Sequence, residues 1–285
     1  MFARPFAWYL IFKYEPMYGI QIAFRRFNPT LGITGSPWVG LTYFKQFFES
    51  YYFTNILWNT ISLSVFTMLI GFPVPILLAL LINEIKNVKF KKLIQNITYI
   101  PNFLSVVVIV SMLTLFSNSD YGLFNKITGL FGIAPVDFMS KPALFQPLYV
   151  FSNVWQFMGF NAIIYIAALS SVDQELYEAA SIDGATRLQK IIHISIPCIM
   201  STIIVLFIMR IGSLMSVGFE KVYLMQNSVT LSASEVISTF IYKNGIQKGQ
   251  FSYSTAVGLF NSVINFVLLV SANFASKKLT KTSLW

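Results

Sequence analysis

The amino-acid sequence predicts an all-α membrane protein with six transmembrane helices, the first of them short or truncated. Three observations indicate this fold class. The chain is 55% hydrophobic and only 11% charged, whereas soluble domains average about 25% charged residues. Five uncharged or nearly uncharged stretches are long enough to span a bilayer, which takes about 20 residues. Lysines gather in two short segments between or after these stretches, a pattern typical of cytoplasmic loops. We expect one transmembrane domain over residues 1–285.

The first element is interrupted by charged residues and a proline. Phe2 to Phe12 is apolar apart from Arg4 and is followed by Lys13, Glu15 and Pro16, so this stretch alone is too short to cross. A secretory signal peptide is one alternative, but the segment has no small-residue cleavage site and continues as an aromatic-rich chain. We therefore favour the outer half of a first span whose beginning is missing or unusually short.

The five clear spans follow in order. Their most apolar parts are Trp58 to Ile82, Ile97 to Phe116, Leu148 to Leu169, Ile191 to Met209 and Tyr253 to Ala275. Pro73 and Pro75 are expected to break the first of these, because proline removes a backbone donor. Such a break would be either a gating kink or a packing feature.

Loop charge predicts the orientation. The basic clusters are Lys86, Lys89, Lys91 and Lys92 after the Trp58 span, and Lys277, Lys278 and Lys281 at the C-terminus. The positive-inside rule places both in the cytoplasm, and the four spans between them make the two assignments agree. The same parity puts a loop over residues 171–197 inside, and the longer segments at about 25–55, 117–145 and 216–250 outside.

Several classes of function are excluded by what the sequence lacks. One cysteine, Cys198, rules out an internal disulfide or a cysteine metal cluster, and one histidine, His193, is a poor catalytic candidate. Hydrolase, metalloprotease and phosphate-loop motifs are absent, so we expect no catalytic or metal-binding residues. The net charge of +9 fits contact with anionic membrane lipid, and the basic residues form no stripe with interleaved aromatic residues, which argues against nucleic acid.

The most informative segment is the polar loop between the third and fourth clear spans. It contains Glu178-Ala-Ala-Ser-Ile-Asp-Gly184 and, nine residues later, Ile194-Ser-Ile-Pro197. Ser171 and Gln174 have capping-box spacing, which predicts a helix starting near Val172 or Asp173. Its largely apolar face would comprise Leu176, Tyr177, Ala179, Ala180 and Ile182.

The end of this helix and the start of the next can also be predicted. Gly184 is suited to end the first helix, because glycine accepts the left-handed conformation. Thr186 and Gln189 repeat the capping-box spacing and predict a second helix, which bends or restarts at Pro197. The product would be a helix–turn–helix knob projecting from the membrane. The alternative is an ordinary amphipathic loop helix, which any transporter can have.

This loop resembles the signature of permease subunits of binding-protein-dependent ABC importers, with Ile196 where leucine is usual. Other stretches are similar to the carbohydrate branch of that family, closest to the subgroup for oligosaccharides from complex polysaccharides such as pectin or alginate: Gly35 to Phe44, Asn59-Thr60, Gly71 to Glu84 and Tyr253 to Phe260. The resemblance covers Tyr14 to Trp285 and departs at the front, where the family has a longer basic leader and a full first span.

The resemblance implies a type I ABC importer permease fold, working by alternating access in a bacterial plasma membrane. It implies four kinds of partner: a second homologous permease, two ATPase subunits that bind ATP and Mg²⁺, an extracellular solute-binding (lipo)protein and an oligosaccharide. No cofactor and no enzymatic activity are expected in this chain. The ATPase-coupling residues would be Leu176, Tyr177, Glu178, Ala179, Ala180, Asp183 and Gly184. Glu178 would either pair with a basic residue of the ATPase or cap the knob internally.

The sugar path is predicted on the span before the loop, because polar and aromatic residues within a span are functional candidates. These residues are Asn153, Trp155, Gln156, Phe157, Phe160, Asn161 and Tyr165, followed by Ser213 and Ser216 on the next span. The resemblance agrees, since the related maltose permease uses the corresponding stretch. The alternative is helix packing, or for Trp155 an interfacial anchor. Arg210 would snorkel to the surface or pair across the permease interface.

Three alternative functions differ in the residues that they require. A self-contained secondary transporter would need membrane carboxylates for ion coupling, and the clear spans hold none. A membrane-bound enzyme would need a cluster of His, Asp or Glu at one surface. A permease for a non-sugar solute remains the alternative closest to the favoured interpretation.

Overall fold

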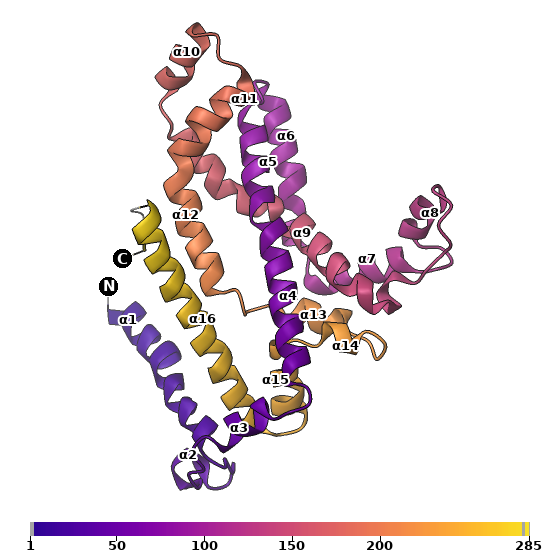
Figure 1. The fold of residues 1–285 in the computed structure, drawn as a ribbon, viewed down its shortest axis with the longest axis vertical. Coiled ribbons are helices and arrows are strands. Elements are labelled where there is room, and N and C mark those ends of the chain that lie inside the picture. Colours follow the sequence, from indigo (N-terminus) through magenta and orange to yellow (C-terminus); the bar gives the residue numbers. More distant parts are fainter. Residues whose placement is uncertain (1–2, 281–282, 285) are drawn as a thin grey trace.

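The computed structural model describes residues 3–280 and 283–284, which form helices and connecting loops with two isolated β-bridges. Figure 1 shows an elongated bundle with α10 (Gln174–Ile182) at one end and α2 (Gly32–Gly35) and α3 (Thr42–Phe48) at the other. Long helices run between the two ends, as expected for a chain that crosses a membrane repeatedly.

Four helices in the described part of the chain are long and apolar enough to cross a membrane: Phe53–Asn83, Pro142–Ser170, Arg187–Gly212 and Phe251–Lys278. They comprise α4 (Phe53–Gly71) with α5 (Pro73–Asn83), α9 (Pro142–Ser170), α11 (Arg187–Lys190) with η5 (Ile191–Ser195) and α12 (Ile196–Gly212), and most of α16 (Phe251–Thr280). These four contain the predicted apolar stretches that begin at Trp58, Leu148, Ile191 and Tyr253, so those predictions are confirmed.

The predicted span from Ile97 to Phe116 is bent in the middle. The chain forms α6 (Val88–Tyr99), η3 (Ile100–Phe103) and α7 (Val106–Ser117), and the two halves meet at 97°. Pro101 lacks a backbone donor, so the α-helical ladder ends there, and Ser105 starts the next helix by accepting a bond from the Val108 amide. This pair makes a fifth span if it is counted as one broken span.

The predicted break at Pro73 and Pro75 is also wrong. Phe72 keeps helical backbone angles (φ −85°, ψ −48°), and its amide donates to the carbonyl of Met68. The two prolines therefore occupy the first turn of α5, where missing donors cost least, and α4 continues into α5 as one 31-residue helix.

The N-terminal segment is a helical run of mixed pitch against α16. It comprises α1 (Ala3–Tyr9), the π turn η1 (Leu10–Tyr14) and the 3₁₀ segment η2 (Glu15–Phe24), which packs on α16. Pro16 follows directly on Glu15, which accounts for the change of pitch there. This run is not among the described helices that meet the criteria for a span.

The remaining short helices lie in the connecting segments between the long helices. They are α8 (Leu123–Gly129), η4 (Phe138–Ser140), α13 (Phe219–Met225), α14 (Leu231–Ser234), α15 (Ile237–Tyr242) and η6 (Lys243–Gln247). They belong to the segments predicted to lie outside, and α13, α14 and α15 lie at the opposite side of the bundle from α10 (Figure 1).

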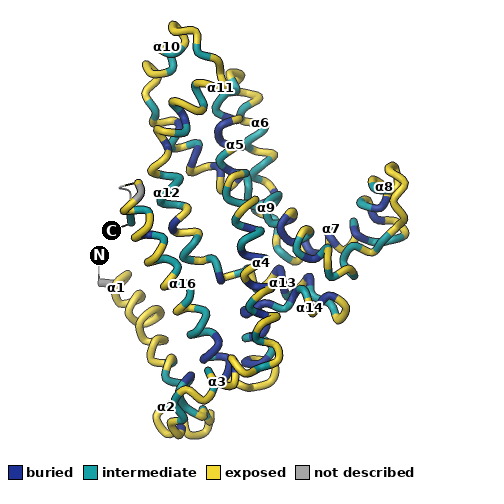
Figure 2. Tube along the Cα trace, in the orientation of Figure 1, coloured by how far each residue is buried: buried dark blue, intermediate teal, exposed yellow. Residues whose placement is uncertain are grey.

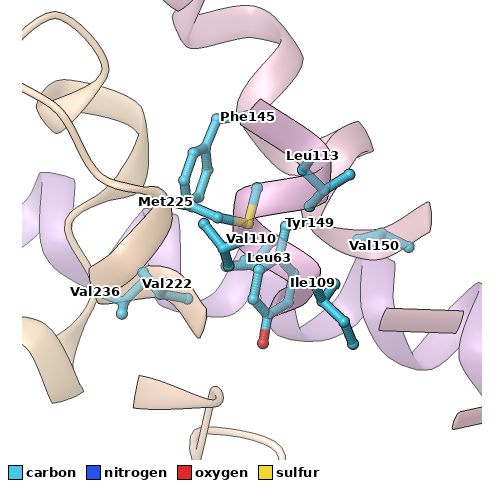
Figure 3. Packing of buried hydrophobic residues seen from close by; sticks show 10 residues of the cluster. All are labelled: Leu63, Ile109, Val110, Leu113, Phe145, Tyr149, Val150, Val222, Met225 and Val236. Atoms are coloured by element: carbon cyan, nitrogen blue, oxygen red, sulfur yellow. The ribbon is translucent and has the colours of Figure 1, made fainter. Parts of the chain in front are cut away.

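Among the described residues, buried hydrophobic side chains form clusters where helices meet. The largest cluster joins α4, α7, α9 and α13 (Figure 3), with Leu63, Ile109, Tyr149 and Val222 among its members. Elsewhere the spans expose their apolar side chains, and α1 is exposed along most of its length (Figure 2). Such outward-facing apolar surface suits contact with lipid or with another membrane subunit.

Candidate functional site

The polar loop folds into a short, well-capped helix, α10. Asp173 is its N-cap, and the Asp173 carboxylate accepts a hydrogen bond from the Glu175 amide at 3.0 Å. The predicted cap, Ser171, instead ends α9, where its hydroxyl donates to the carbonyl of Ala168 at 2.7 Å. The predicted Ser171–Gln174 capping box is therefore wrong, because a carboxylate nearer to the helix takes its place.

Gly184 ends α10 as predicted. Its φ is +76°, its amide donates to the carbonyl of Ser181, and the next amide, of Ala185, donates to the carbonyl of Ala180 at 2.9 Å. These two bonds form a Schellman motif, which requires a left-handed residue at this position. The turn after α10 is thus fixed by backbone geometry.

The second helix of the knob also starts as predicted. The Thr186 hydroxyl accepts from the Gln189 amide at 3.3 Å, and the Gln189 side chain accepts from the Thr186 amide at 2.7 Å. This capping box opens α11, which runs through the π turn η5 into α12. Pro197 lies in the first turn of α12, where its missing amide hydrogen is tolerated.

Two side-chain contacts tie the knob to the long helix. The Tyr177 hydroxyl lies 2.9 Å from Oγ of Ser195, a buried residue of η5. Lys190 Nζ donates to Oγ of Ser181 at 2.6 Å. The two helices of the knob are therefore held together as one unit at the end of α12.

The outer surface of the knob is apolar and uncovered. Leu176, Ile182 and Leu188 are exposed, with Ile182 at 87% of its maximum. Glu178 and Asp183 are exposed beside them, and within residues 3–280 neither carboxylate takes part in an ion pair. Large exposed aliphatic side chains next to unpaired charges are characteristic of a protein–protein contact surface.

A cleft runs along α9 beneath the knob. Its larger part, about 470 Å³, lies between α9, α5 and α12, and its smaller part, about 310 Å³, lies between α9, α4 and the segment after α12. Both parts are lined by Asn153, Phe157, Asn161 and Arg210. The three α9 residues are four positions apart, so they share one face of the helix.

Most of the predicted path residues are brought together here. Phe160 and Tyr165 line the larger part, and Ser213 and Ser216 line the smaller part. Ser216 Oγ also accepts a hydrogen bond from the Asn265 amide group at 3.0 Å. The cleft therefore offers aromatic faces, neutral amides and hydroxyls, the groups that bind sugar rings.

Trp155 and Gln156 do not line this cleft. Trp155 packs against the large hydrophobic cluster, and Gln156 is buried on the far side of α9, where its amide nitrogen donates to the carbonyl of Leu104 at 3.4 Å. Residue type alone selected these two residues, Trp155 as an aromatic and Gln156 as an amide, whereas the four-residue spacing along α9 separates them from Asn153, Phe157 and Asn161.

The sequence interpretation missed other lining residues. Ser64 and Thr67 on α4 and Tyr149 on α9 line the smaller part of the cleft. Ser64 and Thr67 stand three positions apart in an apolar span, a spacing that places both on one face and could have identified them. Arg210 was noted in the sequence but assigned to the membrane surface or a subunit interface.

A buried lysine lies behind the cleft. Lys221 on α13 is only 4% exposed, and its Nζ lies 3.4 Å from Oε1 of Gln156 and 5.8 Å from the centre of the Tyr149 ring. Burial lowers the pKa of Lys221 to about 8, because desolvation disfavours the charged form. Within the described residues, no group of His, Cys, Asp and Glu side chains could hold a metal ion.

A bundle of apolar spanning helices with a polar cleft along one helix and a capped knob at one end defines a membrane transport protein. The family of binding-protein-dependent transport system inner membrane components matches residues 71–281 of this chain. The chain therefore belongs to that family and is a multi-pass membrane permease.

Individual relatives match almost the whole chain. Protein LplB of Bacillus subtilis is 44% identical over 98% of this chain and 87% of its own length. The B. subtilis polygalacturonan/rhamnogalacturonan transport system permease YteP is 45% identical over 95% of this chain and 84% of its own length. The predicted family is thereby confirmed.

A solved structure confirms the predicted fold. A chain of a bacterial ABC transporter involved in the import of the acidic polysaccharide alginate superposes with a TM-score of 0.90 at 39% identity, covering 97% of this chain and 93% of that one. The same type of transporter in complex with an alginate pentasaccharide-bound periplasmic protein gives a TM-score of 0.92 at 39% identity, covering 100% of this chain and 95% of that one.

Proposed function

We propose that this permease forms half of the membrane path of an ATP-driven importer for oligosaccharides. The observation that carries the proposal is the cleft along α9, where Asn153, Phe157 and Asn161 present amides and an aromatic face along one line. The names of the relatives support the same substrate class, since they include transporters of polygalacturonan or rhamnogalacturonan, arabinooligosaccharides and alginate.

The second half of the path comes from a homologous permease. The cleft opens on the surface of this chain, and its polar groups need a partner surface to be shielded from lipid. A solute-binding protein delivers the sugar from outside, and alternating access of the two permeases moves it inward.

The driving force comes from two separate ATPase subunits, which bind ATP and Mg²⁺. We assign ATPase contact to α10, whose residues Leu176 and Ile182 are exposed and whose Glu178 carboxylate is free of ion pairs within the described chain. A groove of the ATPase would close over Ala179 and Ala180, whose small side chains allow a close approach to the backbone. ATPase movement then reaches α12 through Tyr177 and Ser195.

This assignment fixes the orientation in a bacterial plasma membrane. The knob, the lysines of residues 86–92 from the end of α5 into α6, and the end of α16 lie in the cytoplasm, in agreement with the positive-inside rule. The segments at about 25–55, 117–145 and 216–250 then face outward, where the solute-binding protein docks.

Uptake by the reconstituted importer tests the proposed path. The complete complex in proteoliposomes should import labelled oligosaccharide when ATP and the binding protein are supplied. Phe157→Ala and Asn161→Ala should each lower the uptake rate at least about fivefold, the equivalent of losing roughly 1 kcal/mol of binding or transition-state stabilisation. Phe151→Ala is the matched control, because Phe151 is an exposed aromatic residue of α9 that lines a separate apolar hollow.

Two results would overturn the proposal. One is unchanged sugar uptake by both cleft variants. The other is import of a non-sugar solute, such as an amino acid or a short peptide, in preference to every oligosaccharide in a panel. The chain purified alone should hydrolyse no ATP.

A further inference from the structure

We propose that Arg210 is a specificity-determining residue that binds the carboxylate of an acidic sugar, so the path is selective for oligosaccharides that contain uronic acids. This inference rests on the proposed oligosaccharide path and names the substrate class within it. Three observations carry it: the charge of the cleft lining, the lack of a counter-ion, and a second cation behind the same wall.

Arg210 is the charged residue of the cleft lining. It borders both parts of the cleft, and the other lining residues of the two parts are apolar or neutral, without an aspartate or glutamate. The cleft lining therefore carries a formal charge of +1. A path for neutral sugars has no need of this charge, which is costly to hold within a span.

Arg210 has no counter-ion in the described part of the chain. The two ion pairs found there, Lys45–Glu49 and Lys243–Glu235, involve other residues. Arg210 is exposed and lines both parts of the cleft, so a ligand in the cleft can reach its guanidinium. A planar carboxylate matches the paired N–H donors of a guanidinium and can form a bidentate pair with it.

Lys221 adds positive charge to the same wall. Its ammonium lies over the Tyr149 ring at 5.8 Å and is held by Gln156, and Tyr149 lines the smaller part of the cleft with Arg210. Lys221 is buried and takes part in neither ion pair of residues 3–280. Arg210 and Lys221, two cations without carboxylate partners, are therefore both near Tyr149. Their positive electrostatic potentials add and favour the binding of an anion in this part of the cleft.

The chemistry of the remaining lining selects a sugar acid over a small inorganic anion. Phe157 and Phe160 offer flat apolar faces to a sugar ring, and Asn153 and Asn161 offer amides to its hydroxyls. An anion without a sugar ring would leave these groups unused. A uronate residue engages both parts of the site at once.

The test compares two ligands that differ only in charge. Trigalacturonate and its fully methyl-esterified form have the same sugar rings, but the ester carries no carboxylate. Binding of each labelled trisaccharide is measured by equilibrium dialysis against the detergent-purified complete importer, without nucleotide and without the binding protein. The variants are Arg210→Gln, Arg210→Lys, and Lys126→Gln as a control cation exposed on α8.

The wild type should bind trigalacturonate about tenfold or more tightly than the ester, as expected for a hydrogen bond between charged groups. Arg210→Gln should remove this preference by weakening trigalacturonate alone, Arg210→Lys should keep part of it, and Lys126→Gln should keep all of it. Added salt should weaken the wild-type binding of trigalacturonate more than that of the ester.

The outcomes separate this inference from the proposed path. Equal affinity of the wild type for both ligands, or an equal loss of both in Arg210→Gln, overturns the acidic preference but leaves the sugar path standing. If neither trisaccharide nor any neutral oligosaccharide binds the wild-type importer, the proposed path itself fails. Should Arg210→Gln not assemble, Arg210→Lys and the salt dependence of the wild type decide the question.

Discussion

The Tyr177 hydroxyl lies 2.9 Å from Oγ of Ser195, and this contact joins the exposed helix α10 to a buried residue at the end of η5, directly before α12. Eighteen residues separate the two side chains in the sequence. Because Ser195 is 1% exposed, it cannot replace this partner with bulk water. A displacement of α10 is therefore passed to α12 through a direct side-chain link as well as through the chain.

Tyr177→Phe should weaken the coupling of ATP hydrolysis to uptake. The loss of the hydroxyl leaves the Ser195 side chain buried without this partner, a cost of about 1 kcal/mol. We expect fewer sugars imported per ATP hydrolysed, measured by parallel uptake and phosphate-release assays. Tyr223→Phe is the control, because the Tyr223 hydroxyl accepts a similar bond at 2.9 Å from Gln247 at the other side of the bundle. An unchanged transport ratio in Tyr177→Phe contradicts the role of the link.

Gly184→Val should uncouple the importer while membrane insertion stays intact. The left-handed φ of +76° disfavours a β-branched residue by roughly 1–3 kcal/mol, so the Schellman turn opens and α10 loses its position. We expect ATPase activity to persist while uptake falls severalfold. Gly132→Val is a matched control, since Gly132 has a φ of +74° in the 117–145 segment. Normal uptake by Gly184→Val would count against the knob as the coupling element.

Gly159→Ala should destabilise the packing of α9 on α6. A methyl group at this position would overlap the backbone carbonyl of Thr98, and overpacking costs about 1–3 kcal/mol. The expected result is a lower melting temperature of the purified complex, measured by fluorescence-detected unfolding. Gly258→Ala in α16 controls for helix propensity, because its methyl group would meet Ile241 at an ordinary 3.7 Å. Equal melting temperatures of the two variants would show that α9 and α6 do not approach this closely.

Lys221→Met should raise the stability of the protein near neutral pH and reduce its pH dependence. The pKa of Lys221 falls from 10.5 to about 8 on folding, so the unfolded chain binds more protons between these values. The free energy of unfolding of the wild type is therefore lowered below about pH 8, and it recovers as pH rises toward about 10.5. By the difference between the two pKa values, the loss of stability is up to about 3 kcal/mol.

The measurement for Lys221 is the difference in stability between variant and wild type at pH 7 and pH 10. We expect the difference to shrink as pH rises. Lys126→Met, a change at an exposed lysine, should give no such trend. A difference that stays constant from pH 7 to pH 10 would mean that the ammonium group is not the source of the penalty.

Sequence patterns predicted the elements that depend on local chemistry. The four apolar helices, the Thr186 capping box and the Gly184 turn follow from hydropathy and from the geometry of neighbouring residues, and all are present. The bend at Pro101 was not predicted, because it depends on Ser105 starting a new helix in another direction. Proline position alone does not distinguish this case from Pro73, where the helix continues.

Only part of the cleft lining could be predicted, because the lining depends on tertiary packing as well as on residue type. Asn153, Phe157 and Asn161 could be selected by residue type, but which face of α9 is open depends on how α4, α5 and α12 pack against it. Gln156 lies between these residues in the sequence and yet points to Leu104 and Lys221. Tyr149 and Arg210 enter the site from positions 61 residues apart, and only the tertiary fold brings them to one wall.

The uncovered aliphatic tip of the knob has a consequence for how cells must make this protein. Ile182 is 87% exposed. A copy inserted before its ATPase subunits are available therefore presents an exposed hydrophobic surface to chaperones and proteases. We expect such orphan copies to be degraded faster than assembled ones. Balanced synthesis of all subunits is then part of what keeps the transporter intact.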